Sequence, residues 1–145
     1  MLLVDMITRL TETMQRVGPQ NETRSFRGLL VWQQGMRLAK ECYALTKSFP
    51  REEQYGFTSQ IRRAATSIPA NIAEGSGRTT RGAYVSFLRV AQGSLRELET
   101  YLLLASDIEL ATSEHVAPLL RQIDSIARLL NRLIQSLESR PRLTP

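Results

Sequence analysis

The chain has 145 residues, enough for one domain with a single core and too few for two ordinary domains. Its 19 lysines and arginines exceed its 14 acids, which gives a net charge of +5, and the single cysteine, Cys42, excludes an intramolecular disulfide and favours a reducing compartment. The sequence shows no secretory signal and no apolar run near the roughly 18 residues that a membrane span requires, so we expect a cytoplasmic protein without a membrane partner.

Arginine accounts for seventeen of the nineteen cationic residues. A guanidinium group pairs bidentately with phosphate and carboxylate groups, whereas lysine is the usual choice for solubility alone. Two interpretations stay open on composition alone. The arginines fit a binding site for a polyanion, and they fit equally well GC-rich coding or ordinary ion pairing.

Residues 1–24 are predicted to be an N-terminal amphipathic extension and linker. Gly18 and Pro19 break its apolar pattern. The apolar side chains recur at heptad spacing, at Leu3, Ile7, Leu10, Met14 and Val17. Three roles fit this segment: a fifth helix packed on the domain, a helix paired with another subunit, or a frayed extension.

Two helices are predicted over the next part of the chain. The first stops at Phe49-Pro50 and carries an apolar stripe at Val31, Leu38, Cys42 and Leu45, widened by Trp32, Ala39 and Tyr43. The second is predicted from about residue 51 to residue 74. Pro69 should bend it, because proline removes a helical hydrogen bond. Gly75 and Gly77 should end it, since glycine adopts the left-handed conformation without strain.

Two longer apolar seams follow and predict two further helices. Thr79 or Thr80 can cap the first of these helices. The first seam is Tyr84, Leu88, Ala91, Leu95, Leu98, Leu102 and Ala105. The second is Leu119, Ile123, Ile126, Leu130, Leu133 and Leu137, flanked by Leu120, Ala127 and Ile134. Alternating steps of four and three are typical of helical bundles. We therefore predict an all-α fold, an antiparallel up-down four-helix bundle over residues 25–139, followed by a basic tail over residues 140–145.

A polar stripe runs beside the apolar face of the second helix, where side chains meet a neighbouring helix or subunit rather than bulk water. Its members are Gln60, Arg63, Ser67, Asn71, Glu74 and Arg78.

Gly93 lies inside the third predicted helix, where glycine lowers helix stability. Its presence there has two explanations. One is a tolerated kink with close helix packing within the monomer. The other is a subunit interface, where backbones approach closely at Gly93 and arginines meet acids such as Glu97 from the next chain.

Charge is unevenly distributed along the chain. Residues 51–96 contain seven arginines and three glutamates, whereas residues 97–120 contain five acids and no lysine or arginine. If the helices alternate in direction, Arg78 and Arg81 lie at one end of the bundle and most of the acids toward the other. Arg81 near a helix N-terminus opposes the helix dipole, and a bound anion would relieve that opposition.

Catalytic and metal-binding patterns are poor. His115 is the single histidine and has no cysteine or second histidine nearby, and the heptad position of Cys42 is typical of a core thiol. Glu97 and Glu99 are two residues apart and point to different sides of a helix. The Gly75-Ser76-Gly77 run follows a helix rather than a strand, so it does not fit a nucleotide-binding loop. We expect no enzyme activity, no metal and no cofactor.

Most of the chain, from Phe26 to about Leu137, resembles the four-helix bundle proteins encoded in intervening sequences of bacterial 23S ribosomal RNA genes. The matching phrases are Leu30-Val31-Trp32-Gln33, Leu45-Thr46-x-x-Phe49-Pro50, Tyr55-Gly56, Gln60-Ile61-Arg62-Arg63-Ala64, Ser67-Ile68-Pro69-Ala70-Asn71-Ile72-Ala73-Glu74-Gly75, Phe87-Leu88 and Gly93-Ser94-Leu95-x-Glu97-Leu98-Glu99-Thr100. The resemblance implies a ring-like homopentamer. It also implies a relation to the accessory variability determinant of diversity-generating retroelements, which binds nucleic acid and a reverse transcriptase. Residues 1–24 lie outside it.

Our leading hypothesis is a non-enzymatic homo-oligomer that binds structured RNA or DNA, with RNA preferred. The candidate phosphate contacts are Arg62, Arg63, Arg78, Arg81, Arg89 and Arg96. The candidate subunit contacts are Gln60, Ser67, Asn71, Glu74, Gly93 and Glu97. The alternative is a protein-interaction scaffold whose arginines serve assembly. An enzyme using Asn71 and Glu74 near the Pro69 bend would need a pocket that raises a carboxylate pKa, and the sequence gives no sign of one.

Overall fold

Within residues 25–139 the apolar seams fold into four α-helices, which two short 3-10 helices accompany. The computed structural model describes residues 3–5 and 25–139. Within the second range the elements are η1 (Phe26–Gly28), α3 (Leu30–Thr46), η2 (Arg51–Glu53), α4 (Phe57–Ser76), α5 (Arg81–Asp107) and α6 (Ser113–Glu138), and this range contains no strand. The predicted basic tail, and the predicted N-terminal extension apart from residues 3–5, lie outside the described residues.

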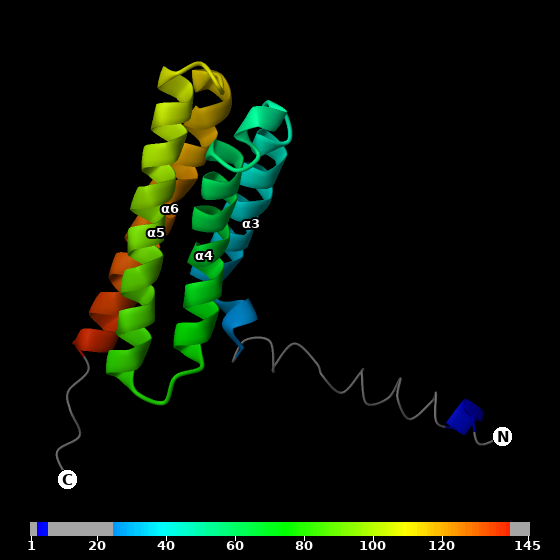
Figure 1. Ribbon diagram of the computed structural model, residues 1–145. Helices are drawn as coiled ribbons and strands as arrows, with labels where there is room; N and C mark the ends of the chain where they lie inside the picture. The colour runs from blue at the N-terminus through cyan, green and yellow to red at the C-terminus, as the bar shows by residue number, and fades with distance from the viewer. Residues whose placement is uncertain (1–2, 6–24, 140–145) are drawn as a thin grey trace, which may run out of the picture.

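The four α-helices pack side by side as a four-helix bundle (Figure 1). Around it, α3 contacts α4, α4 contacts α5, α5 contacts α6, and α6 closes on α3. The α4–α5 connection lies at one end, together with η1 and the last turn of α6, whereas η2 and the α5–α6 connection lie at the other end (Figure 1). No helix in the described part of the chain is long and apolar enough to cross a membrane.

The predicted apolar seam of α5 is buried, whereas the predicted seam of α6 needs a correction. From Leu88 to Ala105 each predicted α5 position is buried. On α6 the buried line continues from Leu130 to Ile134, while Leu133 and Leu137 are only partly buried. The reason is helical geometry, because steps of four and three drift slowly around a straight helix of 3.6 residues per turn.

Gly75 has a different role from the one predicted. It lies inside α4 and is buried, and Gly77, the residue after the helix, has a right-handed φ of −85°. The prediction of left-handed glycines is therefore wrong. A Cβ on Gly75 would lie 2.8 Å from the Phe87 Cβ and 2.9 Å from Tyr84 Cδ2. Glycine is required here because α4 and α5 approach too closely for a side chain.

The predicted ends of the first two helices also need correction. The first helix ends at Thr46, before the predicted Phe49-Pro50, and Phe49 packs into the core from the connection. Residues 51–53 form the separate η2, and α4 begins at Phe57. The Glu53 carboxylate accepts a hydrogen bond from the Phe57 backbone N–H at 3.1 Å, so it serves one of the free donors of the first turn of α4.

Two threonines cap the later helices. The Thr80 hydroxyl accepts a hydrogen bond from the Ala83 N–H at 3.2 Å, which confirms one of the two predicted caps of α5. The Thr112 hydroxyl accepts one from the His115 N–H at 3.3 Å at the start of α6. Each cap satisfies a backbone donor that the helix itself leaves unpaired.

Candidate nucleic-acid interface

The six predicted arginines lie at three places on the bundle. Arg62 and Arg63 belong to the first half of α4. Arg78 lies in the α4–α5 connection, Arg81 begins α5, and the other two lie further along α5. All are exposed except Arg62, which is half-buried. The end that carries Arg78 and Arg81 is opposite the end that carries Asp107 and Glu109 (Figure 1).

Arg62 lies in the contact between α3 and α4. Its Nε donates to the Thr46 hydroxyl at 2.9 Å, and its guanidinium carbon lies 4.5 Å from the centre of the Tyr43 ring. Both interactions hold the side chain within one subunit, the second through cation–π attraction. The geometry gives Arg62 a packing role, and its predicted phosphate contact stays a prediction.

Arg63 lies on the polar stripe of α4, and Arg78 follows that stripe in the connection after the helix. Arg63 donates to the Gln60 side-chain oxygen at 3.3 Å. Arg78 forms a 2.7 Å ion pair with Glu74, and its guanidinium lies 4.7 Å from the centre of the Phe87 ring. Exposed pairs of this kind contribute only about 0–1 kcal/mol, so either guanidinium can exchange its partner for a phosphate at small cost.

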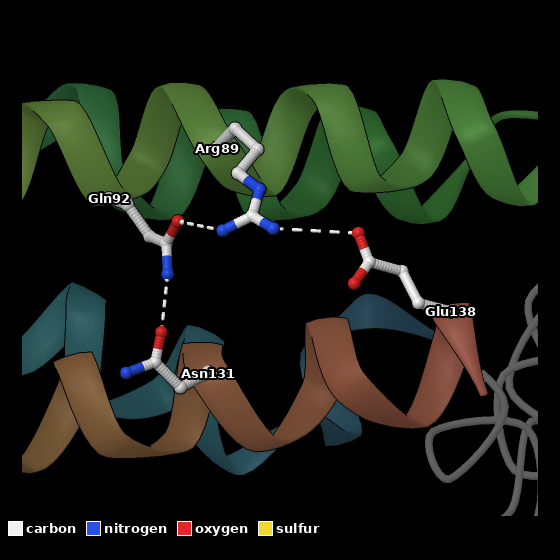
Figure 2. A network of polar contacts seen from close by, with 4 residues as sticks. All are labelled: Arg89, Gln92, Asn131 and Glu138. Atoms are coloured by element: carbon white, nitrogen blue, oxygen red, sulfur yellow. Dashed lines mark hydrogen bonds and ion pairs between the residues drawn. The ribbon is translucent and has the colours of Figure 1, made fainter.

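Arg89 belongs to a polar network that joins α5 to α6 (Figure 2). It donates to the Gln92 side-chain oxygen at 3.1 Å and to Glu138 at 3.4 Å, and Gln92 in turn donates to the Asn131 oxygen at 2.6 Å. The network ties the C-terminal turn of α6 to the first half of α5. It also holds the Arg89 guanidinium at the surface between the two helices.

Arg96 and Gly93 lie one turn further along α5. Arg96 pairs with Glu99 at 2.6 Å. With Gln92 and Asn131 they line a groove of about 310 Å³ between α5 and α6. A Cβ placed on Gly93 would meet no atom within 4 Å, so the explanation by close packing within the monomer is wrong. An exposed glycine in mid-helix costs about 0.5–1 kcal/mol relative to alanine, and no contact of the described chain offsets this cost.

The outer face of α6 carries three arginines that we did not select from the sequence. Arg121, Arg128 and Arg132 are exposed, and no hydrogen bond or ion pair joins them to another described residue, although the exposed Asp124 lies one turn from both Arg121 and Arg128. Their spacing of seven and then four residues places them on one face of the helix, over about 16 Å. This spacing could have predicted an exposed row of arginines, but the sequence interpretation of α6 rested on its apolar seam, which lies on the opposite face of the helix.

Side chains of the polar stripe of α4 form hydrogen bonds within their own subunit. The hydroxyls of Ser67 and Ser94 share a 2.8 Å hydrogen bond between α4 and α5, and the Asn71 amide donates to both the hydroxyl and the carbonyl oxygen of Ser67. Glu97 is half-buried and has no partner among the residues described. The roles of these residues in a subunit interface stay predictions.

The structure does not bring catalytic groups together. Within the described ranges no three His, Cys, Asp or Glu side chains are placed to hold a metal ion. Cys42 is fully buried in the core, which confirms the predicted core thiol, and its burial, with a smaller effect of Glu41, raises its pKa from 9.0 to about 12. A thiol with so high a pKa is a poor nucleophile at neutral pH.

Comparison with known proteins identifies the family. The family model described as 23S rRNA-intervening sequence protein matches residues 27–132. This chain belongs to that family. Among solved structures, the chain is similar to a protein of unknown function from the S23 ribosomal protein family of Bacteroides thetaiotaomicron, with 25% identity and a TM-score of 0.66 over 73% of this chain and 99% of that one. The search of curated proteins gave no match.

Membership of the 23S rRNA-intervening sequence family confirms the resemblance seen in the sequence. The matched range starts at residue 27, after the predicted N-terminal extension, and ends within α6. The candidate arginines on α4 and α5, and all three arginines of the α6 face, fall inside it. The extension of residues 1–24 is therefore a feature of this chain that the family match does not cover.

Proposed function

We propose that this 23S rRNA-intervening sequence protein is a non-enzymatic, cytoplasmic homo-oligomer, a pentamer, whose antiparallel up-down bundles bind structured nucleic acid, preferably RNA. The observation that carries the proposal is the outer face of α6. There Arg121, Arg128 and Arg132 are exposed and have no acidic partner in the described part of the chain. Guanidinium groups in such a row are suited to successive phosphates of a polyanion.

The arrangement of exposed cations supports the same interpretation. The α4–α5 end adds Arg78 and Arg81, and the neighbouring α5 surface adds Arg89 and Arg96. The acids that pair with Arg78, Arg89 and Arg96 are exposed or only partly buried, and such pairs break at little cost. Phosphate contacts can therefore extend from α6 across α5 to one end of the bundle.

Contacts between neighbouring helices support the antiparallel part of the proposal. On α4 and α5, Phe57 packs on Tyr101 while Ser67 bonds to Ser94, so residue numbers rise on one helix as they fall on the other. The same order holds between α5 and α6 in the network of Figure 2. Short connections between such neighbours are the usual pattern of an up-down bundle.

Affinity in this mechanism comes from repetition. A few phosphate contacts per subunit give weak, salt-sensitive binding, because each contact releases counterions from the nucleic acid. Repetition of the same row of arginines around a ring makes the second and later contacts intramolecular, which can raise the overall affinity by about 10²–10⁴. Assembly and binding are then linked, and a monomeric variant should lose most of its affinity.

The test is size-exclusion chromatography with light scattering on the purified chain, with and without a structured RNA hairpin, at low and moderate salt. A ring-sized oligomer that takes up the RNA and releases it as salt rises is the expected result. A ring that ignores RNA at low salt would overturn the nucleic-acid assignment. A monomer would contradict the proposed assembly.

A matched pair of variants locates the contact. Arg128→Ala removes an arginine of the α6 face, and Arg51→Ala removes an exposed arginine from η2 at the other end of the bundle. Each lowers the net charge by one. Arg128→Ala should weaken RNA binding and lower the magnitude of the slope of log K against log salt by about one for each subunit that contacts the RNA. Arg51→Ala should change binding and slope little. Equal effects would mean that only total charge matters.

One observation favours a second candidate, a protein-interaction scaffold. The exposed Gly93 lies in the α5–α6 groove beside Arg96, and its Cβ position is open to a neighbouring molecule. If the arginines serve assembly, Arg63→Ala or Arg96→Ala should break the oligomer. If they serve nucleic acid, these variants should stay assembled and bind RNA more weakly. No change in either property would exclude Arg63 and Arg96 from both roles and leave the α6 face as the nucleic-acid contact.

A further inference from the structure

A second apolar stripe of α3 stays uncovered in the bundle. Trp32, Met36 and Tyr43 lie on it, and together with Pro69 and Ala70 of α4 they line a groove of about 470 Å³ between the two helices. Trp32 is only partly buried and Tyr43 is 41% exposed. The sequence suggested that Trp32 and Tyr43 widen the core face. In the structure Trp32 packs against the edge of the core, as predicted, whereas Tyr43 lies at the surface, where Arg62 of α4 stacks on its ring.

The chemistry of this groove suits an apolar partner. Lys40 is the single charged residue that lines it, in the described part of the chain. A phosphate-binding groove would need several converging cations, such as the arginines of α6. Small side chains at Ala70 and Ala73 leave room on the α4 side for another helix to approach.

The polypeptide enters the bundle at one end of this groove. Ser25 caps η1, and the Phe26 ring packs edge to face on the Trp32 ring with centroids 5.3 Å apart. Since η1 contacts both α3 and α4, the chain that precedes Ser25 joins the bundle beside the Trp32 end of the groove.

We propose that residues 3–17 dock as an amphipathic helix in the α3–α4 groove of their own subunit. Their apolar residues recur at heptad spacing, and Asp5 and Glu12 fall at the position opposite that stripe. Where the structure describes this segment, Leu3 and Val4 are each 68% exposed, so apolar side chains on the segment lack cover just as the groove does.

The dimensions of the segment fit the groove. As a helix, residues 3–17 would be about 21 Å long, and α3 runs for about 16 Å between Trp32 and Tyr43. The connecting residues 18–24 can span at most about 25 Å, enough to reach the groove from Ser25. Connections of this length commonly join antiparallel neighbours in helical bundles, and a short tether gives a millimolar effective concentration, which favours the segment of the same subunit.

Trp32 provides a direct test, because it is the single tryptophan of the chain and lines the groove. Acrylamide quenching of its fluorescence should rise by at least about twofold in full-length Ile7→Glu, which charges the docking face, and in Ala70→Glu, which charges the groove. Thr8→Glu, on the polar face of the segment, and Ser59→Glu, on α4 outside the groove, are the matched controls and should behave like the wild type. Circular dichroism verifies the fold of each variant.

Each other outcome overturns the proposal. If Ile7→Glu leaves Trp32 as accessible as in the wild type, the segment does not cover the groove. If acrylamide quenching of Trp32 in the wild type rises on dilution, another molecule covers the groove. Loss of this concentration dependence in Ile7→Glu would assign the cover to the N-terminal segment of a neighbouring subunit. The same concentration dependence in Ile7→Glu would assign the cover to the bundle of a second copy. Ala70 is exposed, so Ala70→Glu removes no core contact of the bundle.

Discussion

Gly75→Ala tests the close approach of α4 and α5 most directly. The added Cβ would lie 2.8 Å from the Phe87 Cβ, 2.9 Å from Tyr84 Cδ2 and 3.2 Å from the Tyr84 carbonyl oxygen. The first and last of these atoms are fixed to the backbone of α5, so a rotamer change cannot relieve the contact. The two helices would have to move apart along a buried seam.

The magnitude follows from two opposing effects. Overpacking of a core position typically costs about 1–3 kcal/mol. Alanine in a helix gains about 0.5–1 kcal/mol over glycine. Because two of the contacts involve atoms that cannot rotate away, we expect a net loss of about 1–2 kcal/mol in the free energy of unfolding. With a urea m-value of about 2 kcal/mol/M, the unfolding midpoint should fall by about 0.5–1 M.

Gly93→Ala is the matched control. It makes the same chemical change in the neighbouring helix, at a position where a Cβ meets no atom within 4 Å. Its midpoint should rise by about 0.3–0.5 M, the gain in helix propensity alone. Both variants are compared with the wild type by circular dichroism at 222 nm at one protein concentration, because assembly makes apparent stability depend on concentration. A Gly75→Ala midpoint at or above that of the wild type would refute the reasoning. A fall in Gly93→Ala would show that Gly93 contacts a molecule outside its own chain.

Three further predictions concern buried and capping groups. Cys42 should resist Ellman's reagent at pH 8 in the folded protein and react fully in urea, and rapid labelling without urea would contradict its burial. The pKa of Cys42 in the folded protein, about 12, exceeds its ordinary value of 9.0, so the contribution of the buried thiol to stability is complete below pH 9 and is lost as pH rises from 9 toward 12. The urea midpoint of the wild type should therefore fall more between pH 8 and pH 10.5 than the midpoint of Cys42→Ala. Thr80→Ala and Thr112→Ala should each lower the free energy of unfolding by about 0.5–2 kcal/mol, since each removes a helix cap. Thr79→Ala removes no described cap, and an equal loss there would assign the effect to the loop.

The sequence was sufficient to predict the helical elements and the family, because both depend on local patterns. A seam such as Leu88 to Ala105 repeats often enough that one misplaced residue does not hide it. The role of Gly75 could not be predicted in the same way. A glycine near a helix end fits a cap and a close helix contact equally well, and only the position of Phe87 on the next helix distinguishes them.

The candidate site was less accessible to sequence reasoning than the fold. Arg89 bonds to Glu138, 49 residues away, and Arg62 stacks on Tyr43 of a different helix. Such pairs depend on which helix faces cross in space, so the sequence alone cannot separate an arginine used for packing from one left at the surface. The α6 arginines show the converse, since their periodicity was visible but their lack of acidic partners required the packed bundle.

The first and last residues of the bundle lie at the same end of it, which gives the bundle a direction. Ser25, the α4–α5 connection and the last turn of α6 share one end of the bundle, and the connections at the opposite end lie far from both (Figure 1). A fluorophore, affinity tag or fused domain attached directly before Ser25 or directly after Ser139 is therefore anchored on the same side. In a cyclic assembly, all such attachments would decorate a single rim and leave the other rim bare, so the two faces of the ring could be told apart by electron microscopy.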